Sequence, residues 1–197
     1  LHIHTGVGNL GTFSHTATSR AAAEVLKSNW ENCIVERGDT RKGLPWNLAQ
    51  FGSNTSFTMT RTNYVAAMDA KRKLQEIAAK DLGGSPDNYD VADEKVFNKS
   101  NRSTSLTFAQ AAKRAIELGG EYSGLEVPED LNPQTKRAVA GLAGTGLIGV
   151  SKDNLEKSGT APALAAGFVQ IELDLETGKY EILDYVGVAD CGTVLHP

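Results

Sequence analysis

Two short loops rich in glycine and hydroxyl side chains carry the residues best suited to chemistry in this chain. The first loop, residues 11–16, reads Gly-Thr-Phe-Ser-His-Thr, and the second loop, residues 52–56, reads Gly-Ser-Asn-Thr-Ser. Each loop precedes a helix-like segment, so it offers hydroxyls and orphan backbone amides where the helix dipole favours negative charge. The pair of loops therefore predicts a site for a phosphate-bearing or electron-rich heterocyclic cofactor.

An ordinary structural role is also open for these hydroxyls. Ser53, Thr55 or Ser56 could cap a helix by accepting hydrogen bonds from its first amides, and Ser14 or Thr16 could do the same at the first loop. Hydroxyl residues are the default at helix starts. It is the presence of two such loops, each between a strand and a helix, that favours contact with a ligand.

A dinucleotide site is a further alternative. Gly6, Gly8 and Gly11 have the spacing of the dinucleotide fingerprint and follow a strand-like segment. The acidic residue expected about 20 residues further on would be Glu36 or Asp39. The absence of further strand–helix units argues against this site.

The histidines and cysteines give a weak case for a metal. His2 and His4 project from the same side of a strand and His15 follows, but no carboxylate lies beside them at ligand spacing. We therefore expect surface or supporting histidines. Cys33 and Cys191 form no Cys-x-x-Cys pair, so we expect no iron–sulfur or zinc site. We assign no catalytic residue and no metal ligand to this chain.

The elements that must position the loops alternate between strand and helix. Strands over residues 2–8 and 33–36 flank a helix over residues 14–27, and a longer helix covers residues 57–81 and ends at Gly83. These elements make a strand–helix–strand unit. The positions expected to face the core are Ala17, Ala21, Ala22 and Val25 in the first helix and Ala67, Ala70, Leu74 and Ile77 in the second.

The middle of the chain carries weaker signals. Short strands are expected at residues 89–91 and 95–97, and residues 121–137 are expected to form a loop. Thr107 and Gln110 form a capping box for a helix over residues 108–118.

Near the end of the chain, the pattern predicts a β-hairpin. Residues 169–173 alternate between apolar and polar, and residues 176–179 form a turn into an apolar strand over residues 180–189. The patterns predict a first strand near the surface and a second that is more buried. The fold class is α+β, with a mixed β-sheet covered by two or three amphipathic helices and a C-terminal hairpin.

Composition narrows the classes of function. Among 197 residues, 20 are basic and 24 acidic, and no basic stripe carries interleaved aromatics, so nucleic acid is not expected as a partner. No apolar run approaches the ~20 residues of a membrane span, and no signal peptide is evident. We expect a cytoplasmic location, with export alongside a partner subunit left open. The missing initiator Met leads us to expect a piece of a longer polypeptide.

Taken in order, these segments resemble the second cofactor-binding lobe of the molybdenum-cofactor (molybdopterin)-binding large subunit in the xanthine dehydrogenase and aldehyde oxidase family. The resemblance spans nearly the whole chain, and its motifs gain specificity from their order. It is carried by residues 8–16, 36–40, 52–56, 169–173, 176–178 and 190–192, and by Pro197.

The resemblance implies a molybdenum hydroxylase. Such an enzyme uses molybdopterin, a molybdenum–pyranopterin that also occurs as a dinucleotide, to hydroxylate an aldehyde or N-heterocycle with water-derived oxygen. It also implies [2Fe-2S] clusters and FAD on partner domains or subunits, together with the remaining lobes of the molybdenum subunit. The family's base glutamate lies beyond this chain, so residues 1–197 would be a partial molybdopterin-binding domain, with parts at 1–82 and 105–197, inactive in isolation. The alternative is a non-catalytic interaction or assembly domain.

Site residues follow from the resemblance position by position. Thr12 stands where many relatives have Gln, Phe13 where a small residue is common, and Thr60 where Gly is frequent. The residues implied to bind the cofactor are Gly11, Thr12 and Phe13 in the first loop and Gly52, Ser53, Thr55 and Ser56 in the second.

Overall fold

The computed structural model describes residues 1–39, 41–157 and 164–193, and the chain divides into two compact units, Leu1–Leu155 and Glu156–Pro197. The sequence-based division at 1–82 and 105–197 stays a prediction. In the first unit the elements are β1 (His2–His4), α1 (Ser14–Leu26), η1 (Trp30–Asn32), β2 (Ile34–Glu36), α2 (Asn54–Leu82), η2 (Pro86–Asn88), β3 (Tyr89–Ala92), β4 (Lys95–Asn98), β5 (Ser105–Thr107), α3 (Phe108–Leu118) and α4 (Pro133–Ala140). The second unit contains β6 (Ala165–Leu173) and β7 (Tyr180–Ala189).

The predicted strand–helix–strand unit is confirmed, because β1 pairs in parallel with β2 and α1 connects them. β1 is shorter than expected. Thr5 still donates its amide to Glu36 O at 3.0 Å, but its hydroxyl then accepts from the amide of Val7 at 3.2 Å, which turns the chain away from the ladder. At Gly6 a Cβ would collide with the carbonyl oxygen of Pro45, so the segment leading to the second loop crosses directly over this glycine.

α1 starts at Ser14, one of the two residues expected to cap it, so its predicted caps are wrong. The N-cap position is Phe13 in the left-handed conformation, with no side-chain cap, and Ser14 is the first helical residue. The predicted buried face is also partly wrong, because Ala17 is exposed. Alanine side chains are small, so their spacing only weakly indicates which face of the helix is buried. A polar residue can lie on the buried face when the helix backbone accepts its hydrogen bond. The buried Thr18 does so by donating its hydroxyl to Ser14 O at 2.8 Å.

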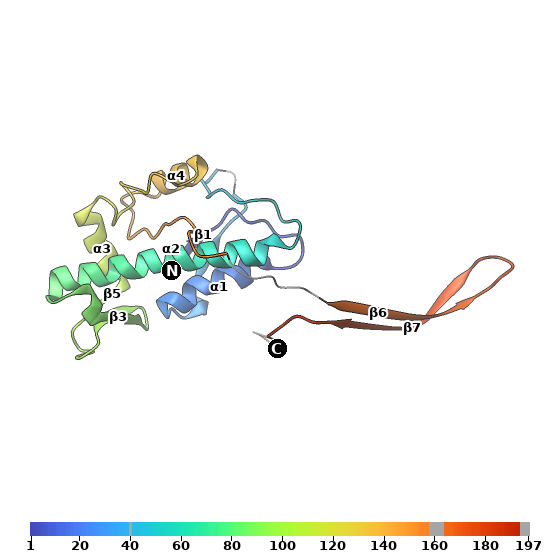
Figure 1. The fold of residues 1–197 in the computed structure, drawn as a ribbon. Coiled ribbons are helices and arrows are strands. Elements are labelled where there is room, and N and C mark those ends of the chain that lie inside the picture. The colour runs from blue at the N-terminus through green and yellow to red at the C-terminus, as the bar shows by residue number, and fades with distance from the viewer. Residues whose placement is uncertain (40, 158–163, 194–197) are drawn as a thin grey trace. The chain divides into compact units, whose positions relative to one another are not determined.

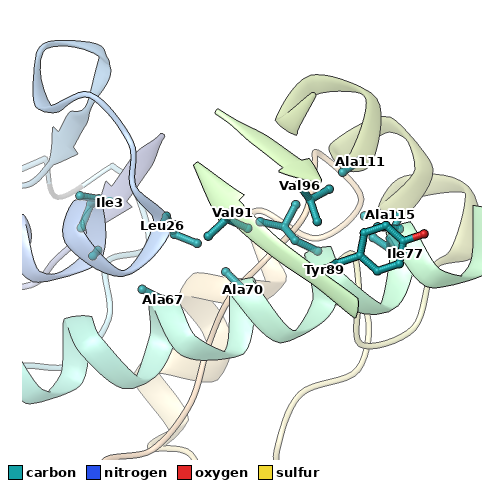
Figure 2. Packing of buried hydrophobic residues seen from close by; sticks show 13 residues of the cluster. Ile3, Leu26, Ala67, Ala70, Ile77, Tyr89, Val91, Val96, Ala111 and Ala115 are labelled. Atoms are coloured by element: carbon teal, nitrogen blue, oxygen red, sulfur yellow. The ribbon is translucent and has the colours of Figure 1, made fainter. Parts of the chain in front are cut away.

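The long helix α2 forms the spine of the first unit (Figure 1). It begins three residues before the predicted start, and it ends at Gly83 as predicted. All four predicted core positions, Ala67, Ala70, Leu74 and Ile77, are buried. Figure 2 shows side chains from α1, α2, α3 and the β3–β4 strands meeting in one cluster, with Leu26, Ile77 and Tyr89 among them.

The middle of the chain forms a three-stranded antiparallel sheet in the order β3-β4-β5, against which α3 packs. β5 was not predicted. The capping box of α3 is confirmed: the amide of Gln110 donates to the Thr107 hydroxyl, and the Thr107 amide donates to the Gln110 side chain at 2.8 Å. The expected loop over residues 121–137 is wrong at its end, because α4 begins at Pro133. The amide of Gln134 donates to Asn132 Oδ1 at 2.8 Å, a helix-start signal that two nearby prolines obscured.

A buried ionic cluster fastens residues 147–150 to α2. The ammonium of Lys73, whose side chain is 4% exposed, lies 2.7 Å from Asp69 and donates to Ile148 O at 2.8 Å. The amide of Val150 donates to the same carboxylate at 3.0 Å. Beside this cluster a Cβ at Gly149 would lie 2.5 Å from the carbonyl oxygen of Ala66, so the two backbones are in direct contact.

The second unit is an antiparallel hairpin of β6 and β7, as predicted. Asp174 organises its turn by accepting from the amides of Glu176 and Thr177 at 2.9 and 3.2 Å. Every residue of both strands is exposed, so the prediction that β7 is more buried is wrong. A continuous apolar run indicates burial only where a second layer covers it, and within this unit there is none among the described residues. No helix in the described part of the chain has the length and apolarity needed to cross a membrane.

Candidate cofactor-binding site

A shared hydroxyl joins the two glycine loops. Ser14 Oγ lies 2.9 Å from Thr12 Oγ1, and Gln50 donates its side-chain amide to the same oxygen at 2.5 Å. Ser14 closes the first loop and Gln50 lies just before the second, so the loops meet at the N-terminal end of α2 (Figure 1). The structure thus brings together the two segments that the sequence singled out, while their contact with a cofactor stays a prediction.

Both loops enter their helices through left-handed backbone. Gly11 and Phe13 have φ of 89° and 53°, and Gly52 and Ser53 have φ of 59° and 56°. For a bulky residue such as Phe13 this conformation is strained by roughly 1–3 kcal/mol. A Cβ at Gly11 or Gly52 would meet nothing within 4 Å, so both glycines border open space.

The amides available to an anion are those of the first helical turns. In the first loop, Asn9 Oδ1 accepts from the amides of Gly11 and Phe13 at 3.0 and 3.1 Å, so these donors are used internally. Four of the first-turn amides have no protein acceptor in the hydrogen bonds of residues 1–39, 41–157 and 164–193. They belong to Ser14 and His15 in α1 and to Thr55 and Ser56 in α2.

The hydroxyls differ in where they lie. Ser53 is exposed and makes no cap hydrogen bond to α2, so its role as an ordinary N-cap is not supported. Thr12 is exposed and paired with Ser14, whereas Thr55 is buried and Ser56 is exposed. The exposed ring of Phe13 lies 6.2 Å, centroid to centroid, from the ring of His15.

His15 does not match the expectation of a surface histidine. It is 5% exposed, and its Nδ1 has no hydrogen-bond partner among the described residues. Burial lowers the pKa of His15, and the nearby positive charge of Arg37 lowers it further. His2 and His4 stack on one side of β1, as expected from alternation. In the part of the chain that the structure describes, no three metal-ligating side chains come together.

The two carboxylates considered for a nucleotide ribose are engaged elsewhere. Lys42 donates to Glu36 at 2.6 Å, and this hydrogen bond lowers the pKa of Glu36. Arg41 binds Asp39 at 2.9 Å and lowers its pKa in the same way. Moreover, β2 is the one partner of β1 among the described strands, so the larger parallel sheet of a dinucleotide fold is not formed by them.

Comparison with known proteins decides the family. A family model described as the molybdopterin cofactor-binding domain matches residues 1–197. This chain belongs to that family. The resemblance to the xanthine dehydrogenase and aldehyde oxidase family is thereby confirmed, and molybdopterin is the cofactor that the family's description names. Thr40 and Pro197, which helped to carry the resemblance, lie outside the described residues.

Individual relatives agree with the family match. The molybdopterin cofactor-binding domain is 26% identical over 201 residues to the aldehyde oxidoreductase molybdenum-binding subunit PaoC of Escherichia coli (strain K12). The match covers 99% of this chain and 22% of PaoC, so the chain spans about a fifth of the length of that relative.

Solved structures share the fold. A reconstituted CO dehydrogenase from Oligotropha carboxidovorans matches with a TM-score of 0.61 and 21% identity, over 97% of this chain and 22% of that chain. Quinoline 2-oxidoreductase from Pseudomonas putida 86 matches with a TM-score of 0.53 and 17% identity, over 95% of this chain and 21% of that chain. The α+β class of the molybdopterin cofactor-binding domain is confirmed.

Sequence reasoning missed Gln50, and it missed the contacts by which Ser14 and Asn9, both in segments that it singled out, shape the site of this molybdopterin cofactor-binding domain. Gln50 and Ser14 join the loops, and Asn9 organises the first one. Asn9 was detectable, since an Asn two residues before a Gly commonly accepts from the amide two residues on. Gln50 was not, because it makes its contact across 36 residues of sequence.

Burial of His15 predicts a dependence of stability on pH. Because its pKa is lower in the folded state than the ordinary value of about 6.5, the unfolded chain binds more protons in acid, and stability falls as pH drops below that value. Urea unfolding at pH 7.5 and 5.5 should show this loss, and His15→Asn should reduce it. The exposed His2→Asn serves as control. An equally steep loss in His15→Asn would contradict the assignment.

Proposed function

We propose that this chain is the molybdopterin-holding part of a molybdenum hydroxylase, an oxidoreductase that hydroxylates an aldehyde or N-heterocycle with water-derived oxygen. The observation that carries the proposal is the junction of the two loops at Ser14, in a chain whose whole length matches the cofactor-binding family. PaoC, an aldehyde oxidoreductase subunit by name, supports the aldehyde arm of the proposal. An iron–sulfur partner, an FAD partner and a cytoplasmic location belong to the same proposal.

The residues present fit such a cofactor. Gly11 and Gly52 border open space that a Cβ would enter, so a flat ring system can approach the backbone closely there. The unpaired first-turn amides of α1 and α2 suit phosphate oxygens. The orphaned Nδ1 of His15 adds one polar atom without a partner among the described residues at the same helix start.

Within this proposal, each residue has a binding or orienting role. When bound, molybdopterin supplies the redox-active molybdenum at which oxygen is transferred to the substrate. Gly11 and Gly52 permit its approach, and the amides of residues 14, 15, 55 and 56 orient its anionic groups. Ser14 and Gln50 hold the two walls at a fixed separation. No described residue of this chain is assigned as the base.

The proposal is tested on the complete molybdenum subunit that carries this chain. Metal analysis should find molybdenum in the purified subunit, and an oxidised extract should show pterin fluorescence. With its partners present, the subunit should reduce an artificial electron acceptor when given an aldehyde or N-heterocycle. A complete subunit free of molybdenum and pterin would contradict the proposal. Oxidation of an aldehyde or N-heterocycle by residues 1–197 alone would also contradict it.

The exposed loop hydroxyls give a milder test. Thr12→Ala combined with Ser53→Ala should lower bound molybdenum in the complete subunit by roughly fivefold or more, because each hydrogen bond contributes about 0.5–1.5 kcal/mol and the two together contribute about 1–3 kcal/mol. Thr145→Ala combined with Ser100→Ala removes two exposed hydroxyls far from the loops and should leave molybdenum unchanged. If molybdenum content and turnover are the same in both doubles, Thr12 and Ser53 do not touch the cofactor.

A further inference from the structure

The hairpin of β6 and β7 exposes many large apolar side chains. Among the described residues its two strands form a sheet of their own, with both outer edges unpaired. A two-stranded hairpin is at best marginally stable in water unless another layer packs against it. The exposed apolar residues are Phe168, Val169, Ile171, Leu173, Tyr180, Ile182, Leu183, Tyr185, Val186 and Val188.

Strand register sorts these residues onto two different faces. Along β6, Val169, Ile171 and Leu173 point to one side, and they pair with Tyr185, Ile182 and Tyr180. These six residues form a continuous apolar surface, which we name the tyrosine face. The opposite side carries Gln170, Glu172, Glu181 and Asp184 at this level, and it carries Phe168, Val186 and Val188 nearer the start of β6.

A bulge makes this separation possible. The register shifts between Gln170 and Ile171, and Leu183 has no direct partner in β6. Without the extra residue, Ile182 would lie on the acidic side of the strand. On the tyrosine face, a Cβ at Gly167 would lie 3.0 Å from the Tyr185 hydroxyl, so the Tyr185 ring extends over the glycine and lengthens the apolar surface.

Charge decides which side another layer can cover. Three carboxylates on the acidic side would lose their hydration if covered, at a high free-energy cost, whereas the tyrosine face offers six apolar side chains, of which two carry a hydroxyl. This pattern is typical of an antiparallel sheet that packs on a core with one face and meets water with the other. An apolar surface of this kind marks an interaction site.

We propose that the tyrosine face is a docking surface for an apolar layer supplied by the rest of the molybdenum subunit. The choice of occupant rests on the proposed function and on length: the hairpin lies within the matched segment, and PaoC and the CO dehydrogenase chain are each several times longer than that segment, which covers 22% of each of them. A second copy of this chain is the competing occupant, and the test separates the two.

Hydrogen exchange gives the first arm of the test. Backbone amides of residues 165–173 and 180–189 are followed in the 197-residue chain and in the complete subunit. Because docking adds the missing layer, these amides should exchange roughly a hundredfold or more slowly in the complete subunit. Equal exchange in both samples would overturn the proposal. Because both samples have the unsubstituted sequence, this result does not depend on whether any variant folds.

Two neighbouring substitutions give the second arm. Ile171→Lys places a charge on the tyrosine face, and Gln170→Lys places the same charge on the acidic side one residue away. In the complete subunit Ile171→Lys should lower the melting temperature by several degrees and restore fast hairpin exchange, while Gln170→Lys should do neither. In the 197-residue chain, where both positions are exposed, the variants should behave alike.

Two further measurements separate the docking proposal from the competing occupant and from the proposed function. If sedimentation equilibrium shows the 197-residue chain to be a dimer that Ile171→Lys dissociates, the tyrosine face binds a second copy and the proposal is wrong. Molybdenum content is measured on the same samples of complete subunit. Slow hairpin exchange in a subunit without molybdenum would refute the proposed function and leave the docking surface standing, and the reverse result would refute only the docking surface.

Discussion

Replacing Lys73 with methionine is expected to lower the free energy of unfolding of the Leu1–Leu155 unit by about 3 kcal/mol. The substitution leaves the carboxylate of Asp69 buried with one cation fewer, and it removes the donor to Ile148 O. Breaking a buried ion pair from one side costs about 3–5 kcal/mol, and the lower end applies here because Arg72 still contacts Asp69 at 2.9 Å. Thermal unfolding should show a drop of roughly 6–12 °C for a unit of this size.

The same helix provides the control. Lys71 pairs with Asp90 at 2.6 Å, but both side chains are considerably more exposed than those of Lys73 and Asp69. Lys71→Met should therefore cost less than about 1 kcal/mol, as exposed ion pairs usually do. If the two variants unfold at the same temperature, the cluster at Lys73 does not fasten residues 147–150 to α2.

Gly52→Val should reduce molybdenum bound to the complete subunit by at least about tenfold, which corresponds to 1.4 kcal/mol of binding free energy. Gly52 adopts φ of 59° beside open space at the start of α2. A branched side chain there would occupy the volume through which the cofactor approaches the backbone, and it would also strain the left-handed turn. Metal analysis of the purified subunit measures the loss.

Strain alone is separated from steric exclusion by a glycine at the other end of the same helix. Gly83 has φ of 90°, also with nothing within 4 Å of an added Cβ. Gly83→Val imposes at least as much backbone strain, but it lies at the opposite end of α2 from the loops. We expect it to lower the melting temperature while molybdenum content stays normal. Equal molybdenum loss in both variants would mean that Gly52 acts through stability.

Elements with strong local signals were predictable from the sequence. The capping box at Thr107 set the start of α3, and the 3–4 spacing of Ala67, Ala70, Leu74 and Ile77 set the buried face of α2. α1 shows the limit of this reasoning. Its alanines are small enough to lie on either side, so the buried face was decided by packing, with Thr18 satisfying its own hydroxyl within the helix.

The two loops of the candidate site could be singled out from the sequence, but the contacts that join them could not, and the binding of a cofactor by these loops stays a prediction. Glycines and hydroxyls marked both loops, but the sequence could not show that Gln50 reaches Ser14, because that contact depends on how the segment after Gly43 folds back over Gly6. The orphaned Nδ1 of His15 was equally hidden, since burial is a property of the packed unit. Short-range patterns encode turns and caps, whereas contacts between distant segments follow only from tertiary structure.

The helix starts at Phe13 and Ser53 have a consequence for how the protein matures. Neither cap supplies a side-chain acceptor, so two helix ends keep amide donors without an acceptor among the described residues. A ligand that accepts from them stabilises the folded form by mass action, in proportion to the logarithm of its concentration over its dissociation constant. On the proposed function, the chain that has bound its cofactor is therefore the more stable one, and proteases should cleave the cofactor-free chain first.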